Sequence, residues 1–403
     1  MHDSSVAQGG PARDPEAPAV RTLALRYVFE DVPRLIASLA GIALVVALVL
    51  VQGGIYSAFV TSSTLLIDES DAPIWVASRG MSYLEITLPV PYGWVKKVRA
   101  IPGVAHAEPL AIRSAIRQSS AGVLDYVRVI GFEPDGSSLH LGVAQQTLAA
   151  MKLGDFAADA AQLPVLDAGG VGAAGNIRGI PARVAALTHG TQPIVSPTFV
   201  YTTFNSAVAW TPLSLGEIMG GTPATDSPIS FVLVQLRSPS DAPAVEAAIE
   251  RALPESHAYS RQDVAAITRT FWIKRTSIGF ILALGALIGA LGGGVVVAQI
   301  LYVSVNAHLR EYALLKAVGI PDRSLYGAIV WQALALAVLG YIPGLAICAI
   351  VVAYAAAARG LYFAVTPLDA LLALAVALVI CVGAGLLAIR RAVRIDPALV
   401  FDA

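Results

Sequence analysis

The chain has 403 residues, of which 56% are hydrophobic and only 14% are charged, and its mean hydropathy is +0.69. Soluble domains carry about 25% charged residues, so this composition argues against an ordinary soluble enzyme and indicates a membrane protein. Its 27 basic and 28 acidic residues give a net charge of −1, which provides no large basic surface for nucleic acid. The two cysteines, Cys348 and Cys381, both lie in long apolar runs, so we expect no disulfide framework.

Four stretches are apolar over about 20 residues or more, the length that a helix needs to cross a bilayer. The sequence therefore predicts an α-helical membrane protein with four transmembrane helices, one plus three, at 34–60, 272–305, 325–358 and 368–389. The first three exceed the minimum, so we expect them to tilt or to protrude beyond the lipid. The segment ahead of the first helix is too long for a cleavable signal peptide.

The positions of lysine and arginine predict the orientation of these helices. Basic residues gather in the N-terminal tail, in the connection between the second and third helices, and in the C-terminal tail. By the positive-inside rule both termini are cytoplasmic. Arg269, Lys274 and Arg275 disagree, but they end a long segment, where the rule loses force.

The segment 61–271 is then a large extracytoplasmic α+β domain, inserted between the first two helices. Alternating patterns predict half-buried strands at 126–132 and 231–237 and helices at 92–100 and 243–253. A stretch rich in glycine, alanine and proline, 166–197, interrupts the domain. It is either a loop-rich insertion or a mobile functional flap.

The remaining pieces are expected on the cytoplasmic side. Residues 1–19 have the composition of a disordered tail, and 20–33 predicts an amphipathic helix lying on the inner leaflet. Residues 306–324 predict a short charged helix that ends at a glycine cap and a proline. From the pattern alone, this segment is either a separate helix or a polar extension of the second span. The tail is 390–403.

The sequence lacks every motif that would supply energy or catalysis. No lysine stands in a G-K-[ST] phosphate loop, and no H-E-x-x-H, G-x-S-x-G or C-x-x-C motif occurs. The predicted spans contain essentially no ionisable residue, whereas an ion-coupled transporter needs such groups inside the bilayer. We expect no cofactor, no metal and no enzymatic activity in this chain, so either a partner drives it or it moves nothing.

Glycines recur in the second predicted span. Gly285, Gly289 and Gly293 form two overlapping G-x-x-x-G pairs, a spacing that lets two helix backbones approach closely. The pattern favours helix packing, although glycine is also simply common in membrane helices.

Two motifs resemble signatures of the FtsX/MacB-like family of ABC transporter permeases. REYALLKAVG at 310–319 is similar to the family's R-E-[IY]-[AG]-[IL]-[LM]-[KR]-A-[LIV]-G, and RRAVRIDPA at 390–398 is similar to its C-terminal R-R-x-x-[RK]-x-[DN]-P-[AV]. The order of parts also agrees over nearly the whole chain. The first half most resembles the DevC branch, through LRY at 25–27, LLID at 65–68, IWVASRG at 74–80 and VRAIPGV at 98–104, with AEP at 107–109.

The resemblance implies the permease subunit of an ABC exporter that works by mechanotransmission. ATP and magnesium would bind a separate ATPase dimer, and 306–324 would be the coupling helix that touches it, through Arg310, Glu311, Tyr312, Leu315, Lys316 and Gly319. It also implies a homodimer in the bacterial inner membrane, for which we expect contact through Gly285, Gly289 and Gly293, and a second helix whose outer part is a stalk.

The resemblance further implies a periplasmic adaptor of the HlyD/MacA kind, a TolC-like outer-membrane channel in some systems, and a MacB-like periplasmic domain. The cargo would be hydrophobic or amphiphilic: a lipid or glycolipid, a drug or a peptide. Two alternatives are an FtsX-like signalling scaffold that controls a cell-wall hydrolase without transporting anything, and a lipoprotein-releasing permease.

Overall fold

The computed structural model describes residues 32–194, 196–220, 223, 225–307, 321–359 and 365–393. The predicted tail 1–19, most of the predicted interfacial helix 20–33, most of the predicted coupling helix 306–324 and residues 394–403 lie outside the described residues. The chain divides into two compact units, one of membrane helices and one, Ile55–Ile281 with Ala355–Phe363, that holds the inserted domain.

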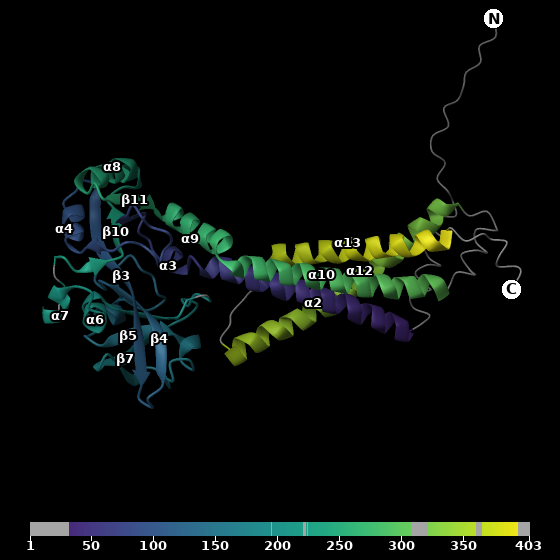
Figure 1. Cartoon of the computed structure of the whole chain (residues 1–403), viewed down its shortest axis with the longest axis horizontal. Coiled ribbons are helices and arrows are strands. Elements are labelled where there is room, and N and C mark those ends of the chain that lie inside the picture. Colours follow the sequence, from purple (N-terminus) through teal and green to yellow (C-terminus); the bar gives the residue numbers. More distant parts are fainter. Residues whose placement is uncertain are drawn as a thin grey trace, which may run out of the picture. The chain divides into compact units, whose positions relative to one another are not determined.

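The described residues contain four helices long and apolar enough to cross a membrane, as the sequence predicts (Figure 1). They are α2 (Val32–Ser62), α10 (Ser277–Ala307), α12 (Asp322–Arg359) and α13 (Pro367–Val393). Their apolar spans are Leu35–Ser62, Ser277–Gln299, Tyr326–Ala357 and Pro367–Leu387. This layout, with a large α/β domain between the first and second spans, confirms the predicted fold class.

The second span begins later than the sequence predicts. Helix α9 (Arg261–Arg275) ends at Arg275, and Thr276 has extended backbone angles, φ −105° and ψ 148°. Helix α10 starts only at Ser277. The expected start at 272 is therefore wrong, because an extended residue separates the charged helix of the domain from the apolar span.

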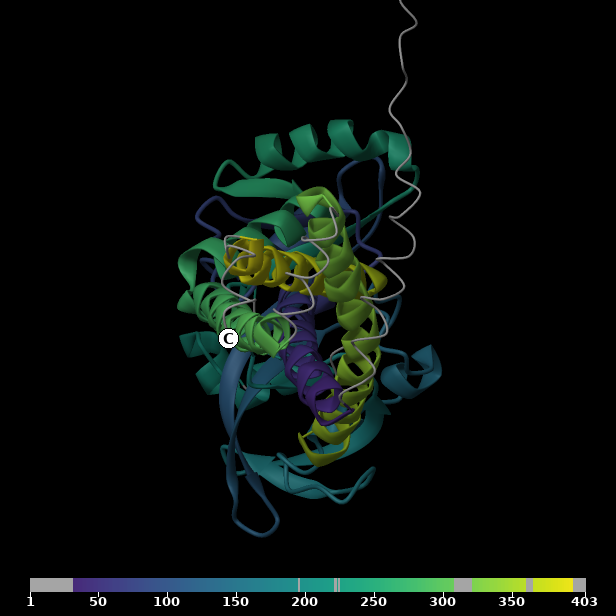
Figure 2. The same cartoon turned by 90° about the vertical axis from the view of Figure 1, so that its right-hand side faces the viewer.

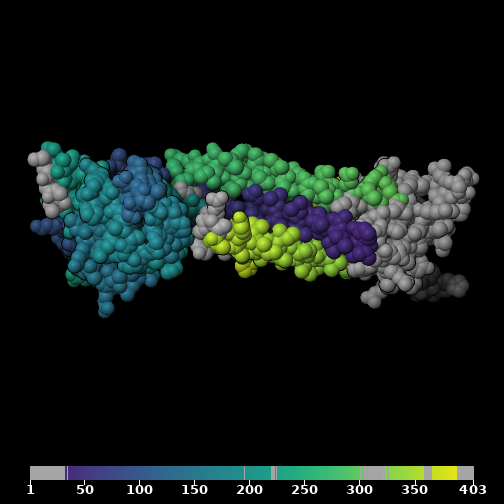
Figure 3. Space-filling model, turned by 90° about the horizontal axis from the view of Figure 1, so that it is seen from below, coloured from purple at the N-terminus to yellow at the C-terminus, as the bar shows by residue number. Residues whose placement is uncertain are grey.

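The membrane helices share one buried apolar cluster. It includes Ile42, Val46 and Leu50 of α2, Val297 of α10, Ile329 and Ala333 of α12, and Ala377 and Cys381 of α13. Viewed along the helices, α2 (purple) has α10 on one side and α12 on the other (Figure 2), and the space-filling view shows the same order (Figure 3). Helix α2 thus lies between α10 and α12.

The inserted domain is built on a nine-stranded sheet in the order β11-β1-β10-β3-β4-β8-β5-β7-β6. Its strands are β1 (Ile74–Ser78), β3 (Val104–Ser119), β4 (Leu124–Phe132), β5 (Asp155–Asp159), β6 (Ala174–Ile177), β7 (Ile180–Thr188), β8 (Thr198–Thr203), β10 (Phe231–Leu236) and β11 (Ser256–Ser260). A separate pair is β2 (Val90–Pro91) with β9 (Pro228–Ile229). The short helices are α3 (Leu65–Asp68), α4 (Gly93–Arg99), α5 (Gln145–Ala149), α6 (Phe204–Trp210), α7 (Leu215–Gly220) and α8 (Ala242–Ala252).

The long strand β3 joins two halves of the domain. Its first part pairs with β10, from Val104 to Leu110. Its last part, Arg117 to Ser119, pairs with β6. Because β6 is also the last strand of the sheet, this second pairing closes β3, β4, β8, β5, β7 and β6 into a barrel.

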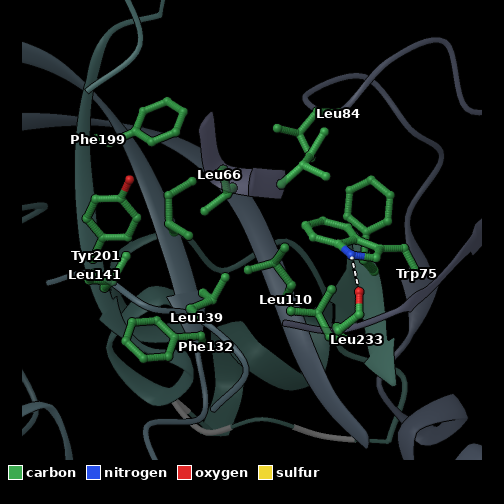
Figure 4. Close-up of a cluster of buried hydrophobic side chains, with 14 of the residues drawn as sticks. Leu66, Trp75, Leu84, Leu110, Phe132, Leu139, Leu141, Phe199, Tyr201 and Leu233 are labelled. Atoms are coloured by element: carbon green, nitrogen blue, oxygen red, sulfur yellow. Dashed lines mark hydrogen bonds between the residues drawn. The ribbon is translucent and has the colours of Figure 1, made fainter. Parts of the chain in front are cut away.

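The half of the sheet outside the barrel, formed by β11, β1 and β10, is covered on both of its faces. In β1, Ile74 and Val76 face a cluster that contains Val95 and Val98 of α4 and Val245 and Ile249 of α8. Trp75 and Ala77 face the opposite cluster, which contains Leu66 of α3, Phe132, Phe231 and Leu233 (Figure 4). The four residues Phe231 to Val234 of β10 are consequently all buried, so the strand predicted there as half-buried is buried on both faces.

The glycine-rich stretch 166–197 is not only a loop. It contains β6 and all of β7, which pair antiparallel as a hairpin from Ala174↔Arg183 to Ile177↔Ile180. Gly179 lies in the two-residue turn between β6 and β7 and has a positive φ of 77°, which glycine adopts without strain. The expectation of a loop-rich insertion is therefore wrong for its middle part, 174–188, which completes the barrel.

Candidate functional site

The structure places the three predicted glycines of α10 against α2 of the same chain. A Cβ on Gly289 would lie 2.2 Å from Cδ2 of Leu48, and one on Gly293 would lie 1.9 Å from Cγ2 of Val45. A Cβ on Gly285 would lie 3.2 Å from Nε2 of Gln52. At Gly289 and Gly293 a side chain would overlap α2 unless its neighbours moved, so these glycines bring α10 directly onto α2. A dimer contact through these glycines stays a prediction.

Helix α12 packs on α2 in the same way, which sequence reasoning missed. A Cβ on Gly340 would lie 2.6 Å from Cγ2 of Ile42, and one on Gly344 would lie 2.7 Å from Cβ of Val46. The signal was present, since these two glycines form a G-x-x-x-G pair around Pro343. Glycine stripes of two helices, α10 and α12, therefore pack closely against α2.

The predicted coupling residues fall between these two helices. Arg310, Glu311, Tyr312, Leu315, Lys316 and Gly319 all lie outside the described residues. The chain on either side of them is described: α10 ends at Ala307, and α12 begins at Asp322. Any force on the segment 308–320 would thus reach two helices that both pack on α2.

An aromatic cluster joins the end of α2 to α9 within the domain unit. The rings of Phe59 and Trp272 meet edge to face with centroids 5.7 Å apart, and Tyr83 stacks on Phe271 at 4.1 Å. Arg269 adds a hydrogen bond of 3.2 Å from Nη2 to the Thr64 hydroxyl. These contacts tie together the two chain segments that connect the domain to the membrane helices.

Arg113 and Glu217 form a buried ion pair inside the domain. Arg113 also donates to the carbonyls of Thr211 and Pro228, and Glu217 accepts from the backbone N–H of Leu213. Burial alone would raise the pKa of Glu217, but the hydrogen bonds from Arg113 and Leu213 lower it below the usual value. The pair fixes α7 and its flanks onto β3, and sequence reasoning had no signal for it.

Glu108 is a buried carboxyl that has no cation beside it within the part of the chain that the structure describes. Its Oε1 accepts from the Ser138 backbone N–H at 2.7 Å and from the Ser138 hydroxyl, whereas its Oε2 has no hydrogen-bond partner. Burial raises the pKa of Glu108, although the Ser138 hydrogen bonds act in the opposite direction. This group holds the loop after β4 onto β3.

Arg117 is fully buried at one end of the barrel. Its Nη1 donates to the Leu166 carbonyl at 2.6 Å, Asp125 lies 3.6 Å away, and its guanidinium lies over the ring of Phe156. Burial lowers the pKa of Arg117. Among the described residues, no group of three or more His, Cys, Asp or Glu side chains could hold a metal ion. The hydrogen bonds of Arg113, Glu108 and Arg117 each hold a loop against β3.

One family of known proteins matches the part of the chain that runs from α10 to the C-terminal tail. Residues 277–397 match the family described as FtsX-like permease C-terminal. This part of the chain is similar to an FtsX-like permease domain. It contains α10, α12 and α13, the segment 308–320 between them and all six predicted coupling residues.

Relatives of the FtsX-like domain are ABC transporter permeases. An uncharacterized ABC transporter permease of Mycobacterium tuberculosis (strain ATCC 25618 / H37Rv) is 36% identical over 107 residues, which are 26% of this chain and 29% of that protein. The macrolide export ATP-binding/permease protein MacB of Hyphomonas neptunium is 35% identical over 127 residues, 31% of this chain and 20% of that protein. The matched segments thus span less than a third of either relative.

Two solved structures are similar to about half of the chain. The periplasmic region of MacB from Actinobacillus actinomycetemcomitans has a TM-score of 0.34 at 10% identity and covers 50% of this chain and 94% of that one. The extracellular domain of the noncanonic ABC-type transporter YknZ from Gram-positive bacteria has a TM-score of 0.31 at 14% identity and covers 46% and 99%. Both scores are below 0.5, and the fold described above rests on its own contacts.

Proposed function

We propose that this chain is the permease subunit of an ABC transporter of the FtsX/MacB type in the bacterial inner membrane. The match of residues 277–397 to the FtsX-like permease domain carries the proposal. The relatives named as ABC transporter permeases and the arrangement of one plus three spans around an inserted domain support it. The DevC-like character of the first half stays a prediction.

A separate ATPase supplies the energy in this proposal. The sequence contains no G-K-[ST] phosphate loop, so ATP and magnesium would bind in the partner, an ATPase dimer, and this chain would be no enzyme. Glu311 and Arg310 are proposed to contact that ATPase, with Tyr312, Leu315, Lys316 and Gly319 completing the coupling helix. Because α10 and α12 flank this segment and both pack on α2, a push there would move α2 as well.

The inserted domain is proposed to receive that motion on the extracytoplasmic side. Helices α2 and α10 each contribute residues to both compact units, and the aromatic cluster of Phe59, Tyr83, Phe271 and Trp272 binds α2 to α9. The subunit would work as a homodimer with a HlyD/MacA-like adaptor and, in some systems, a TolC-like channel. Its cargo would be hydrophobic or amphiphilic.

The experiment that tests this function measures ATP hydrolysis in a reconstituted complex with the partner ATPase. Glu311→Lys should reduce both assembly and stimulation of hydrolysis, because it reverses a charge at the proposed contact. Lys97→Glu is the matched control, a charge reversal at an exposed position of α4 in the inserted domain. Equal assembly and stimulation in both variants would refute the coupling assignment. Co-purification with a cell-wall hydrolase and no cargo movement would instead favour the signalling scaffold.

The orientation is tested by labelling single cysteines from each side of the membrane. Ser120, exposed at the end of the β3–β4 hairpin, and Ser324, near the start of α12, are suitable positions. Ser137 is unsuitable because it is only 9% exposed. We expect Ser120→Cys to react from the outside only and Ser324→Cys from the inside only. Reaction of both from one side would contradict the proposed topology.

A further inference from the structure

A cleft of about 540 Å³ opens in the inserted domain where four segments meet. They are Tyr92 ahead of α4, the end of β4 with the residues after it, the residues after α5, and the start of α6. We call this the β4–α6 cleft; it is lined by Tyr92, Phe132, Glu133, Pro134, Asp135, Ala149, Met151, Leu153, Thr203, Phe204 and Asn205. Its volume lies in the range of about 300–1,000 Å³ that small-molecule sites occupy.

One side of the cleft is aromatic and apolar. Phe132 and Phe204 are 0% and 3% exposed, and the Tyr92 ring stacks on Phe204 with centroids 5.2 Å apart and an interplanar angle of 11°. Met151 and Leu153 add aliphatic surface, and Leu153 is 65% exposed. This side can bury the apolar body of a ligand.

The other side is acidic. Glu133 accepts a hydrogen bond of 3.1 Å from the Tyr92 hydroxyl and one of 2.7 Å from Nη2 of Arg99. Burial and the charge of Glu133 raise the pKa of Tyr92, so this hydroxyl remains a donor at neutral pH. Asp135 is exposed, and no ion pair to it is found within the part of the chain that the structure describes. The carboxylates of Glu133 and Asp135 and the guanidinium of Arg99 together carry a net charge of −1.

The walls are held in place without a ligand. The side chain of Gln145 on α5 donates to the Pro134 carbonyl, and the Gly154 backbone N–H donates to the Ser206 hydroxyl at 3.1 Å. Thr203 caps α6 by accepting from the Ser206 N–H. A cleft fixed in this way loses little conformational entropy when a ligand enters.

We propose that the β4–α6 cleft binds a small organic cation with an apolar body. Its ammonium group would face Asp135 and Glu133, and its apolar part would lie against the exposed Leu153 and the partly exposed ring of Tyr92. An anion would meet two carboxylates, and a purely apolar ligand would desolvate Asp135 without offering it a partner, which is costly. The proposal concerns binding by the inserted domain alone and does not depend on the partner ATPase.

The test uses the full chain in phosphatidylcholine nanodiscs and two probes of nearly equal size. They are 2-phenylethylammonium and the neutral 2-phenylethanol, and saturation-transfer NMR measures contact with the protein after subtraction of protein-free nanodiscs. We expect transfer to the ammonium probe to exceed transfer to the alcohol by about fivefold, the factor that one modest ion pair gives. Equal transfer to both probes would overturn the proposal.

Three variants test whether the ammonium probe binds in the β4–α6 cleft. Asp135→Asn removes the unpaired carboxylate at constant volume, and Met151→Trp fills the cleft; both should reduce transfer to the ammonium probe by about threefold or more. Asp226→Asn, at an exposed aspartate that does not line the cleft, should leave it unchanged. Thermal unfolding followed by tryptophan fluorescence confirms that each variant is folded. Undiminished transfer in folded Asp135→Asn would contradict the proposed charge recognition.

Discussion

Arg113 and Glu217, which lie 104 residues apart, meet through two contacts: Nη2 lies 2.9 Å from Oε1, and Nη1 lies 3.2 Å from Oε2. Their side chains are 3% and 0% exposed. Removing one partner of such a pair leaves an uncompensated buried charge. This pair therefore holds the loop that carries α7 onto β3.

Glu217→Ala should destabilise the inserted domain by about 3–5 kcal/mol, because Arg113 would be left buried and unpaired. The double variant Arg113→Met/Glu217→Leu should recover much of this loss. Tryptophan fluorescence in detergent measures it, since Trp75, Trp94, Trp210 and Trp272 all lie in the domain unit. A single variant as stable as the parent would show that the pair is not a stabilising contact.

The same pair predicts acid sensitivity. Because the pKa of folded Glu217 lies below its ordinary value of 4.5, the stability from this group is fully present above about pH 4.5 and is lost as the pH falls through the folded pKa. The parent should thus lose stability on acidification more steeply than the double variant. Parallel pH profiles for the two proteins would contradict this.

Glu108→Gln should stabilise the chain at neutral pH. The folded carboxyl has a raised pKa, so its contribution is full below the ordinary value of 4.5 and is lost as the pH rises through the folded pKa. A neutral amide of the same shape still accepts from Ser138 and carries no charge to bury. The unfolding temperatures of parent and variant should differ at pH 7 and converge below about pH 4.5. An equal difference at every pH would rule out the titration of Glu108.

Gly293→Ala should disrupt the packing of α10 on α2, and Gly292→Ala should not. The added Cβ at Gly293 would lie 1.9 Å from Val45, whereas no atom lies within 4 Å of one at Gly292. Overpacking of this kind costs about 1–3 kcal/mol. Disulfide trapping between cysteines at Leu48 and Gly289, in a background without Cys348 and Cys381, reports the contact directly. Equal trapping with alanine at 292 and at 293 would count against it.

Gly175→Ala should open the barrel. A Cβ at Gly175 would lie 2.6 Å from the Gln118 carbonyl oxygen and 2.9 Å from Nη2 of the buried Arg117. Ala174→Val, at the exposed neighbouring position, is the control. Trypsin should cut the Gly175→Ala variant after Arg178 or Arg183 sooner than it cuts the parent or the control. Identical digestion of all three would mean that the β3–β6 pairing tolerates the methyl group.

Hydropathy was sufficient to predict the four spans, because an apolar run long enough to cross a bilayer is rarely found outside a membrane helix. The strand β3 was missed for a physical reason. Its inward positions include Arg113 and Arg117, which find Glu217 and the Leu166 carbonyl far along the chain. Polar residues at buried positions erase the alternation by which a strand is recognised.

The candidate site was likewise predicted only in part from the sequence. The stripe of Gly285, Gly289 and Gly293 was visible as spacing, but spacing does not say which helix fills it, and the structure places α2 there. The β4–α6 cleft could not be predicted, because Tyr92, Glu133 and Asn205 come together only through the order of the strands. Local patterns identify elements, whereas sites between elements depend on topology.

The central claim is that the segment 308–320 contacts an ABC ATPase, and photocrosslinking at position 311 tests it most directly. A photoreactive amino acid is placed at Glu311 or, as control, at Ser120, and the captured proteins are identified by mass spectrometry. We predict that position 311 captures a protein with the G-x-x-x-x-G-K-[ST] phosphate loop and that position 120 does not. An ATPase that co-purifies with the chain but crosslinks equally from both positions, or from neither, would contradict the account.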